Sequence, residues 1–424
     1  MSRTNLLRAA SLAALTTLAL ASCAGAEPST NATPASSTPH GFVEGATEAT
    51  EPQLHLATVS TSGEVVLLDL LTETSTTVGT VGTVDDAAAV TTDGRYVFAS
   101  SPTAGGVTVI DTGVWTVDHE DHFHYYRADP RVVGTVDGTG DAVVTGGTTV
   151  TAVWFSETGE GVLLDSAALG TGSIEEVARI SGTPHTGALV PFGESVLATV
   201  ADSSGVPSRV EVLGSDGEPA ESAGATGAAG ATGADCADLA GTITTNVGVV
   251  FGCADGALLA TTTEQGIAFE PIPYPSGVAS GERAFEFHNR DGRPSVAAVS
   301  GTRGAWILDT RERSWTLLNT DVPLLQVSAA DDTGDHVVAL ATDGRILVLD
   351  ATSGALLSST EPILASTLAD PALSSGVELT VDASRAYINA TADDLIYEID
   401  YADGARVART FPADAPAYLV ETGR

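Results

Sequence analysis

The chain has 424 residues, of which 18 are basic and 55 are acidic, so its formal net charge is −37. No lysine occurs in it, which excludes a P-loop lysine, a Schiff-base lysine and a lysine general base. The negative charge also excludes nucleic acid as a partner, because affinity for a phosphate backbone comes mainly from basic residues that displace counterions. A content of 43% hydrophobic and 17% charged residues indicates a globular chain with a packed core.

The N-terminus has the pattern of a bacterial lipoprotein signal peptide. Two arginines precede a mostly apolar stretch, residues 9–21, that is too short to span a bilayer as an anchor. The sequence Leu-Ala-Ser-Cys at residues 20–23 resembles a lipobox, which predicts removal of residues 1–22 and lipidation of Cys23. The alternative is an ordinary signal peptide that is cleaved near Ala26. The lipobox reading predicts an exported protein held by its lipid on the extracytoplasmic side of the cell membrane.

Residues 23–52 are rich in Ala, Ser, Thr, Pro and Glu and contain almost no large apolar residue, so we expect a flexible tether. Beyond the tether, two cysteines remain, Cys236 and Cys253. Export favours their pairing, and the sequence therefore predicts one disulfide bond. The alternative is two separate buried thiols.

One pattern recurs along residues 53–424: an apolar strand that ends in an acidic residue and is followed by a turn of small residues. The clear copies end at Asp69, Asp111, Asp165, Asp309, Asp350 and Asp400. Two weaker copies, with Gly214 and Ala260 at the acidic position, lie in the middle. The first and last copies are 331 residues apart over seven intervals, about 47 residues each, which is the length of a four-stranded propeller blade.

The repeats predict an all-β fold, a single β-propeller domain over residues 53–424 with eight four-stranded blades. Seven blades are the alternative if one weak copy is not a blade, and an open stack is the alternative to a closed ring. The first unit lacks a strand at its start, and Ala417 to Val420 follow the last unit as a spare apolar strand. We therefore expect the C-terminal strand to pair into the first blade and close the ring.

Three of the eight histidines of the chain fall within six positions, in the segment Asp118-His119-Glu120-Asp121-His122-Phe123-His124. Imidazole and carboxylate groups are zinc ligands, and the net charge of the protein favours a dication. In an extended strand His122 and His124 would point to one side, with His119 reaching from the preceding turn. The sequence thus predicts a Zn²⁺ site with His119, His122, His124, Asp121 and Asp118 as candidate ligands. The alternative is a solvated polar loop.

Two further histidines could complete a four-coordinate site. His40 lies on the tether and could swing onto the histidine-rich loop, although an isolated histidine of this kind is more often solvated. His185 begins a strand pattern and could face the axis of the ring, and the alternative is a hydrogen-bonded structural histidine.

The segment from Asp118 to Tyr125 resembles the Asp-His-Gly-Asp-His-x-His-Tyr signature of AztD-type zinc metallochaperones, with Glu120 in place of the usual glycine. Similar stretches occur at His40 to Ala46, Val249 to Gly256, Glu398 to Arg406 and Glu421 to Arg424, so the resemblance covers nearly all of the mature chain. It implies an exported propeller that binds Zn²⁺ and delivers it to the solute-binding protein of a zinc ABC importer. Family members often carry histidines where this chain has Ala240 and Tyr397, so any ligands from those positions are missing here.

Three other functional classes remain open, and one of them is a sensor or storage protein that binds zinc without delivering it. Another is a metal-independent propeller that serves as a docking platform for other proteins. The third is a propeller metal hydrolase, which would need a water ligand and a base beside the histidines. The chain has no Gly-x-Ser-x-Gly, His-Glu-x-x-His or Cys-x-x-Cys motif, and we expect that it is not an enzyme.

Overall fold

The structure is a computed structural model that describes residues 40–81, 89–101, 105–119, 121–220 and 232–424. The chain divides into two units, Met1–Phe42 and Val43–Arg424. The predicted signal peptide, the lipidation site Cys23 and most of the predicted tether lie outside the described residues. No helix in the described part of the chain is long and apolar enough to cross a membrane.

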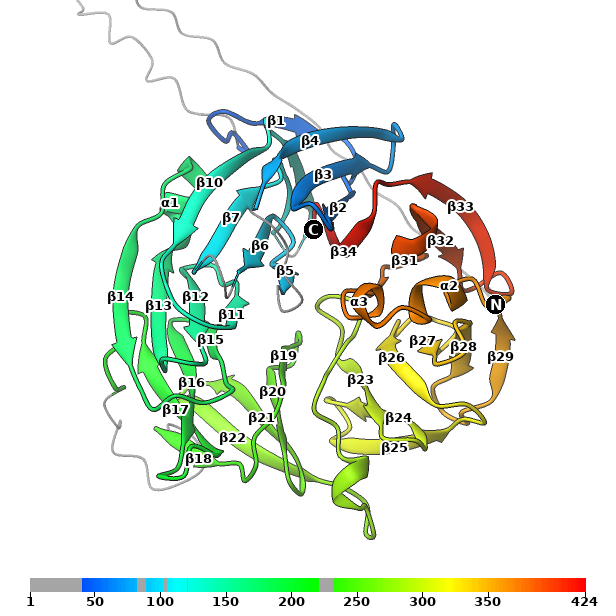
Figure 1. Ribbon diagram of the computed structural model, residues 1–424. Helices are drawn as coiled ribbons and strands as arrows, with labels where there is room; N and C mark the ends of the chain where they lie inside the picture. Colours follow the sequence, from blue (N-terminus) through cyan, green and yellow to red (C-terminus); the bar gives the residue numbers. More distant parts are fainter. Residues whose placement is uncertain (1–39, 82–88, 102–104, 120, 221–231) are drawn as a thin grey trace, which may run out of the picture. The chain divides into compact units, whose positions relative to one another are not determined.

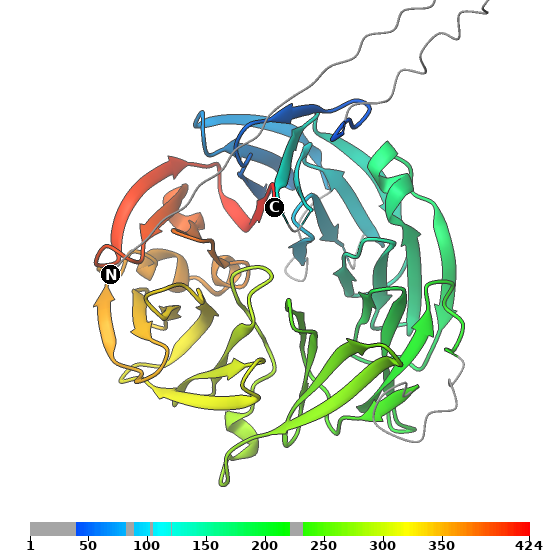
Figure 2. The ribbon, with the colours of Figure 1, turned by 180° about the vertical axis from the view of Figure 1, so that it is seen from behind.

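The second unit is a β-propeller. Among its described residues, eight antiparallel sheets surround a central axis (Figure 1), and the same ring is seen from behind (Figure 2). The first four blades consist, from the axis outward, of β34 (Pro416–Thr422), β2 (His55–Ser60), β3 (Glu64–Asp69) and β4 (Thr74–Thr80); β5 (Val90–Thr92), β6 (Tyr96–Ser100), β7 (Val107–Asp111) and β10 (Arg131–Val136); β11 (Ala142–Thr145), β12 (Val150–Phe155), β13 (Glu160–Asp165) and β14 (Glu176–Ser181); and β15 (Leu189–Phe192), β16 (Ser195–Ala201), β17 (Pro207–Gly214) and β18 (Gly233–Asp235).

The second half of the ring follows the same plan. Its blades consist of β19 (Thr242–Thr244), β20 (Val249–Cys253), β21 (Gly256–Thr263) and β22 (Gly266–Pro273); β23 (Ser295–Ser300), β24 (Gly304–Asp309) and β25 (Ser314–Asn319); β26 (Leu324–Ala329), β27 (His336–Ala341), β28 (Ile346–Asp350) and β29 (Leu356–Ser359); and β30 (Leu379–Val381), β31 (Ala386–Ala390), β32 (Leu395–Asp400) and β33 (Arg406–Pro412). Short helices lie between strands: α1 (Ser166–Thr171), α2 (Ala365–Leu368), α3 (Pro371–Ser374) and the 3₁₀ helices η1 (Ser280–Glu282) and η2 (Thr391–Asp393). The predicted eight-bladed propeller is confirmed, and the sixth blade has three strands.

The acidic residue that marks each clear repeat ends the third strand of a blade. In five of the six, all but Asp400, the carboxylate accepts at least one hydrogen bond from a backbone N–H group of the turn or helix that follows. For example, Asp69 Oδ1 accepts from the N–H groups of Leu71 and Thr72, at 2.8 and 3.1 Å. An aspartate in this position stabilises the segment that follows the strand, which explains why the pattern recurs in most blades.

Burial follows the layering of blades. The second strand of a blade is covered on both faces by its neighbours, and all six residues of β12 are buried, whereas most of the outer strand β4 is exposed. The C-terminal strand β34 pairs with β2, so the last segment of the chain is the innermost strand of the first blade, as predicted. The predicted disulfide between Cys236 and Cys253 is also present, with the Cα atoms 5.1 Å apart.

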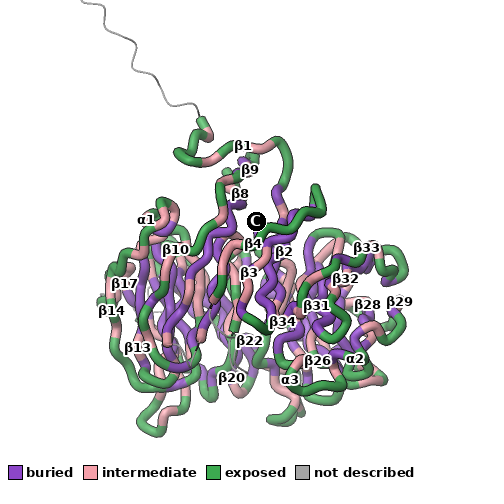
Figure 3. Tube along the Cα trace, turned by 45° about the horizontal axis from the view of Figure 1, so that its top comes forward, coloured by how far each residue is buried: buried purple, intermediate pink, exposed green. Residues whose placement is uncertain are grey.

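One additional sheet departs from the blade plan. The hairpin of β8 (Val114–Asp118) and β9 (Phe123–Arg127) is inserted between the third and fourth strands of the second blade, and β1 (Thr47–Ala49) joins it in the order β1-β9-β8. Figure 3 shows this small sheet at one face of the ring. Residues 47–49 fall within the predicted tether, so part of that segment is structured and belongs to the propeller unit.

Candidate metal centre

The histidine-rich segment forms the tip of the inserted hairpin. His124 lies in β9, and the turn before it is closed by hydrogen bonds from the N–H of His119 to the carbonyl of His122 (2.9 Å) and from the N–H of Asp121 to the carbonyl of His119 (2.8 Å). The pairing of Val117 with His124 and of Trp115 with Tyr126 places these four side chains on one face of the hairpin. The sequence prediction that His122 and His124 point to one side, with His119 in the preceding turn, agrees with this geometry.

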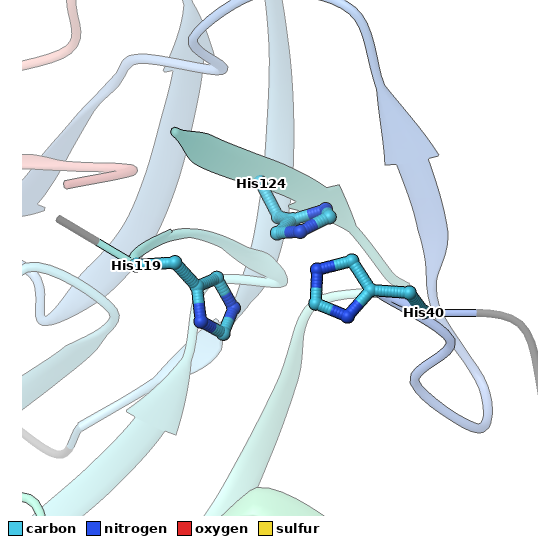
Figure 4. Close-up of side chains that lie close together, drawn as sticks. All are labelled: His40, His119 and His124. Carbon is cyan, nitrogen blue, oxygen red and sulfur yellow. The ribbon is translucent and has the colours of Figure 1, made fainter. Parts of the chain in front are cut away.

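The three imidazoles of the hairpin lie close together. The ring centroids of His119 and His122 are 5.3 Å apart, those of His119 and His124 are 5.1 Å apart, and those of His122 and His124 are 4.8 Å apart. A ligand nitrogen of His119 lies within 4.8 Å of one of His124. Figure 4 shows the rings of His119 and His124.

Carboxylates orient two of these rings. Nδ1 of His124 is 2.6 Å from Oε1 of Glu48, and Nδ1 of His122 is 2.7 Å from Oδ1 of Asp121. An ionised carboxylate can only accept, so each Nδ1 carries the proton and the lone pair of each neutral ring is on Nε2. A carboxylate behind a ligating histidine is the usual arrangement at metal sites, because it fixes the tautomer and raises the basicity of the ligand.

The two Nε2 atoms face each other. They are 3.0 Å apart, and in the neutral tautomers that the carboxylates select, both present lone pairs to the same space. Two lone pairs at this distance repel unless a cation or a proton lies between them. Imidazole ligands of a tetrahedral zinc ion, each about 2.0–2.1 Å from the metal, lie about 3.3 Å apart. A small shift of either ring would therefore place both nitrogens at ligand positions.

The cluster is open to solvent on one side. The side chain of His124 is 8% exposed, whereas those of His122 and Asp121 are 43% and 83% exposed. The hydrogen bond from His122 holds the pKa of the exposed Asp121 carboxyl below its usual value. Asp121 therefore remains ionised at neutral pH and contributes negative charge beside the imidazoles.

Aromatic packing supports the buried side of the cluster. The ring of Tyr126 stacks between those of His124 and Trp115, with centroid separations of 6.1 and 5.1 Å. The guanidinium of Arg95 lies 3.8 Å from the centroid of the Trp115 ring and forms an ion pair with Asp111, the residue that ends the third strand of the second blade. This stack fixes the hairpin to the ring and limits movement of His124.

The other predicted site residues have different surroundings. Asp118 lines a cavity of about 520 Å³ near the C-terminus, together with Phe123 and Tyr125 on the opposite face of the hairpin. His185 is buried under Trp154, and its ring nitrogens contact the Thr183 carbonyl at 2.7 Å and the Thr199 hydroxyl at 2.9 Å. The structure does not bring His185 to the hairpin histidines, and these contacts fit the structural alternative. Glu120 lies outside the described residues, and His40 belongs to the first unit.

Sequence reasoning missed Glu48. It lies 76 residues before His124, in a segment with no apolar pattern, and only the pairing of β1 with β9 brings it to the site. Its local sequence contains no motif that could have identified it.

The fold and the hairpin together define a class of protein: an eight-bladed propeller that carries a metal-capable histidine cluster on an insertion in one blade. No family model matches the chain, and no curated protein matches its sequence. Solved structures do match it. The crystal structure of Citrobacter koseri AztD has a TM-score of 0.71 and 18% sequence identity, over 87% of this chain and 97% of that one.

Two further structures extend the comparison. Apo AztD from the same organism gives a TM-score of 0.70 at 16% identity over 87% of this chain and 97% of that one. The dihydro-heme d1 dehydrogenase NirN gives 0.53 at 16% identity over 89% of this chain and 76% of its own. The chain therefore has the fold of AztD, as the sequence resemblance predicted.

Proposed function

We propose that this protein is a zinc carrier that binds Zn²⁺ at the tip of the inserted hairpin and delivers it to another protein. The observation that carries the proposal is the pair of Nε2 atoms of His122 and His124, which face each other at 3.0 Å while both Nδ1 atoms are held by carboxylates. Such an arrangement suits two zinc ligands, because both lone pairs are directed at one space and carboxylates fix both tautomers.

The donor set favours zinc over the other common divalent ions. Imidazole nitrogens suit zinc, copper and nickel, whereas calcium and magnesium take oxygen ligands, so a histidine cluster excludes the latter two as its natural ions. Among the ions that imidazole suits we propose zinc, because the resemblance of residues 118–125 to the AztD signature supports it over copper and nickel.

His40 is our proposed further ligand. His40 begins one of the stretches, His40 to Ala46, that resemble AztD-type proteins. His40 lies eight residues before Glu48, and eight extended residues span at most about 28 Å, so the chain between them is long enough to bring His40 to the cluster. With His119, His122 and His124 this would give four imidazoles for one zinc ion.

The exposed setting of the site supports transport of zinc rather than structural use or catalysis. Structural zinc sites are closed by four ligands, and hydrolases keep a water ligand in a shaped pocket with a base. Here His122 and Asp121 face solvent at a hairpin tip, where an acceptor protein can approach the ion. We accordingly propose that the protein is not an enzyme.

The acceptor that we propose is the solute-binding protein of a zinc ABC importer, and the location is the extracytoplasmic side of the membrane. The resemblance of residues 118–125 to the AztD signature supports this acceptor, together with the AztD fold. The lipobox at Cys23 supports an anchored form. An anchor would keep carrier and importer on one membrane surface and raise their effective concentration.

A transfer experiment tests the proposal. The protein lacking residues 1–23 is loaded with one equivalent of zinc and mixed with the apo form of the zinc-importer solute-binding protein from the same organism, with a chelator present that captures free zinc. Direct transfer predicts that the acceptor gains zinc faster than the chelator does. If the acceptor gains zinc only at the rate at which the chelator does, the ion is released to solution and the carrier function is wrong. His336→Gln changes a histidine that pairs with Asp332 in the seventh blade instead of one in the hairpin. This control variant should transfer zinc as the parent does.

A further inference from the structure

We propose that Glu48 is a positioning residue for the metal site and that β1, the strand that carries it, is a detachable latch whose displacement loosens the bound ion. This inference rests on the proposed function, because it concerns how the hairpin site holds and releases zinc.

The two orienting carboxylates come from different parts of the fold. Asp121 is adjacent to His122 in the sequence and 83% exposed, so it moves with the hairpin in every state. Glu48 comes from a different strand and contacts His124, the most buried histidine of the cluster, at 2.6 Å. The orientation of His124 therefore depends on whether β1 is in place.

Few contacts hold β1 in place. It has three residues, Thr47 to Ala49, of which the first two are exposed and the third is half-buried, so no large apolar side chain anchors it. It pairs with β9 at the edge of the small sheet, through the register Thr47 with Arg127, Glu48 with Tyr126 and Ala49 with Tyr125. Short edge elements with few buried apolar contacts belong to the least stable parts of a fold and open most readily.

The chain just before β1 is also unpacked. Gly45 has a φ of +80°, and apart from the adjacent residues no heavy atom of the described chain lies within 4 Å of the position where a Cβ would stand. Glycine adopts this backbone conformation without strain, and no described neighbouring element packs against this point to hold β1 in place. Separation of β1 from β9 would carry Glu48 away from His124 without disturbing any blade.

The consequence for zinc follows from the chemistry of the second coordination sphere. Loss of a carboxylate partner of a ligating histidine typically weakens metal binding 10–100-fold. With β1 paired, Nδ1 of His124 is held as a donor and Nε2 is available to the ion; with β1 detached, the ring is free to rotate and to change tautomer. Detachment of β1 would thus convert a site that holds zinc tightly into one that releases it.

Substitutions at Glu48 test the positioning role. Zinc affinity is measured by competition with a chromophoric chelator, and the ligand field of the site is followed by the visible absorption of bound Co²⁺. We expect Glu48→Ala to weaken zinc binding 10–100-fold and to shift the Co²⁺ bands, and Glu48→Asp to recover part of the loss. Glu51→Ala is the matched control, since it removes the same charge from an exposed position on the same segment.

The outcomes separate this inference from the proposed function. If the triple variant of His119, His122 and His124 to alanine loses zinc while Glu48→Ala binds it like the parent, the positioning role is wrong and the carrier function stands. If neither change affects zinc binding, the proposed function itself is wrong.

A second experiment tests the latch. A disulfide between cysteines introduced at Ala49 and Tyr125, which are paired in the register of β1 and β9, would prevent detachment. We expect the oxidised double variant to release zinc to excess chelator at least about tenfold more slowly than either single variant. Equal release rates in the locked protein and the single variants would overturn the latch.

Discussion

The closure of the ring offers a sharp prediction, because one arginine joins the last blade to the first. Arg409 in β33 donates from Nε and Nη2 to Oε2 of Glu398 at 3.0 and 2.5 Å, and from Nη1 to the Leu70 carbonyl at 3.1 Å and to Glu73 at 3.0 Å. Glu398 is 3% exposed, whereas Glu73 is 57% exposed. We predict that Arg409→Ala destabilises the protein mainly by leaving the buried Glu398 with less compensation.

The magnitude follows from these contacts. Removal of one partner of a buried ion pair costs about 3–5 kcal/mol, and a hydrogen bond to a charged group contributes about 1.5–3 kcal/mol. Glu398 keeps a contact with Arg385 at 3.4 Å, and the side chain of Arg409 is 36% exposed, so the lower part of this range applies. We expect the free energy of unfolding to fall by about 2–3 kcal/mol.

Urea unfolding followed by far-ultraviolet circular dichroism measures the effect. Glu73→Ala, which removes the exposed partner of the same guanidinium, should cost less than about 1 kcal/mol. In the background of Glu398→Gln the cost of Arg409→Ala should shrink, because the buried charge is already gone. The reasoning is refuted if the Arg409 and Glu73 variants lose equal stability, or if the Glu398 substitution leaves the cost of Arg409→Ala unchanged.

Three further predictions concern the stability of the fold and the absence of His185 from the metal site. Burial raises the pKa of Glu378 to about 7, with Glu286 as the second cause, so the native state retains a proton that the unfolded state releases. The free energy of unfolding should therefore fall as the pH rises from about 4.5 to about 7. Glu378→Gln should remove up to about 3 kcal/mol of that loss, and urea titrations at pH 5 and pH 8 measure it. Replacement of Cys236 and Cys253 by serine should cost about 3 kcal/mol in the same assay, since their disulfide closes a short loop. His185→Ala should cost about 1–3 kcal/mol and leave zinc affinity, measured by chelator competition, unchanged.

The architecture of the ring was predictable because its physical cause is local and repeated. In six of the eight blades an aspartate ends the third strand, so the same short pattern returns along the chain, and its spacing gives the number of blades. The closing strand was predictable for a related reason: the sequence from Ala417 to Val420 is a spare apolar strand, and the first unit lacks one.

The histidine cluster was predictable as a group of candidate ligands because its three histidines are neighbours in the chain. The contacts that hold these histidines in position could not be predicted. β1 is three residues long and has no apolar alternation, and its pairing with β9 joins residues about 80 positions apart, so neither propensity nor pattern signals it. The orienting contact between Glu48 and His124 exists only because of that pairing. The buried hydrogen bonds of His185 are likewise set by its neighbours in the fold.

The central claim is that the three hairpin histidines bind zinc, and one measurement tests it most directly. The zinc stoichiometry and affinity of the protein lacking residues 1–23 are compared with those of the variant in which His119, His122 and His124 are alanine, with His336→Gln as the control. We predict that the parent and the control bind about one zinc ion tightly and that the triple variant, while still folded by circular dichroism, does not. Equal zinc binding by the parent and the folded triple variant would contradict the account.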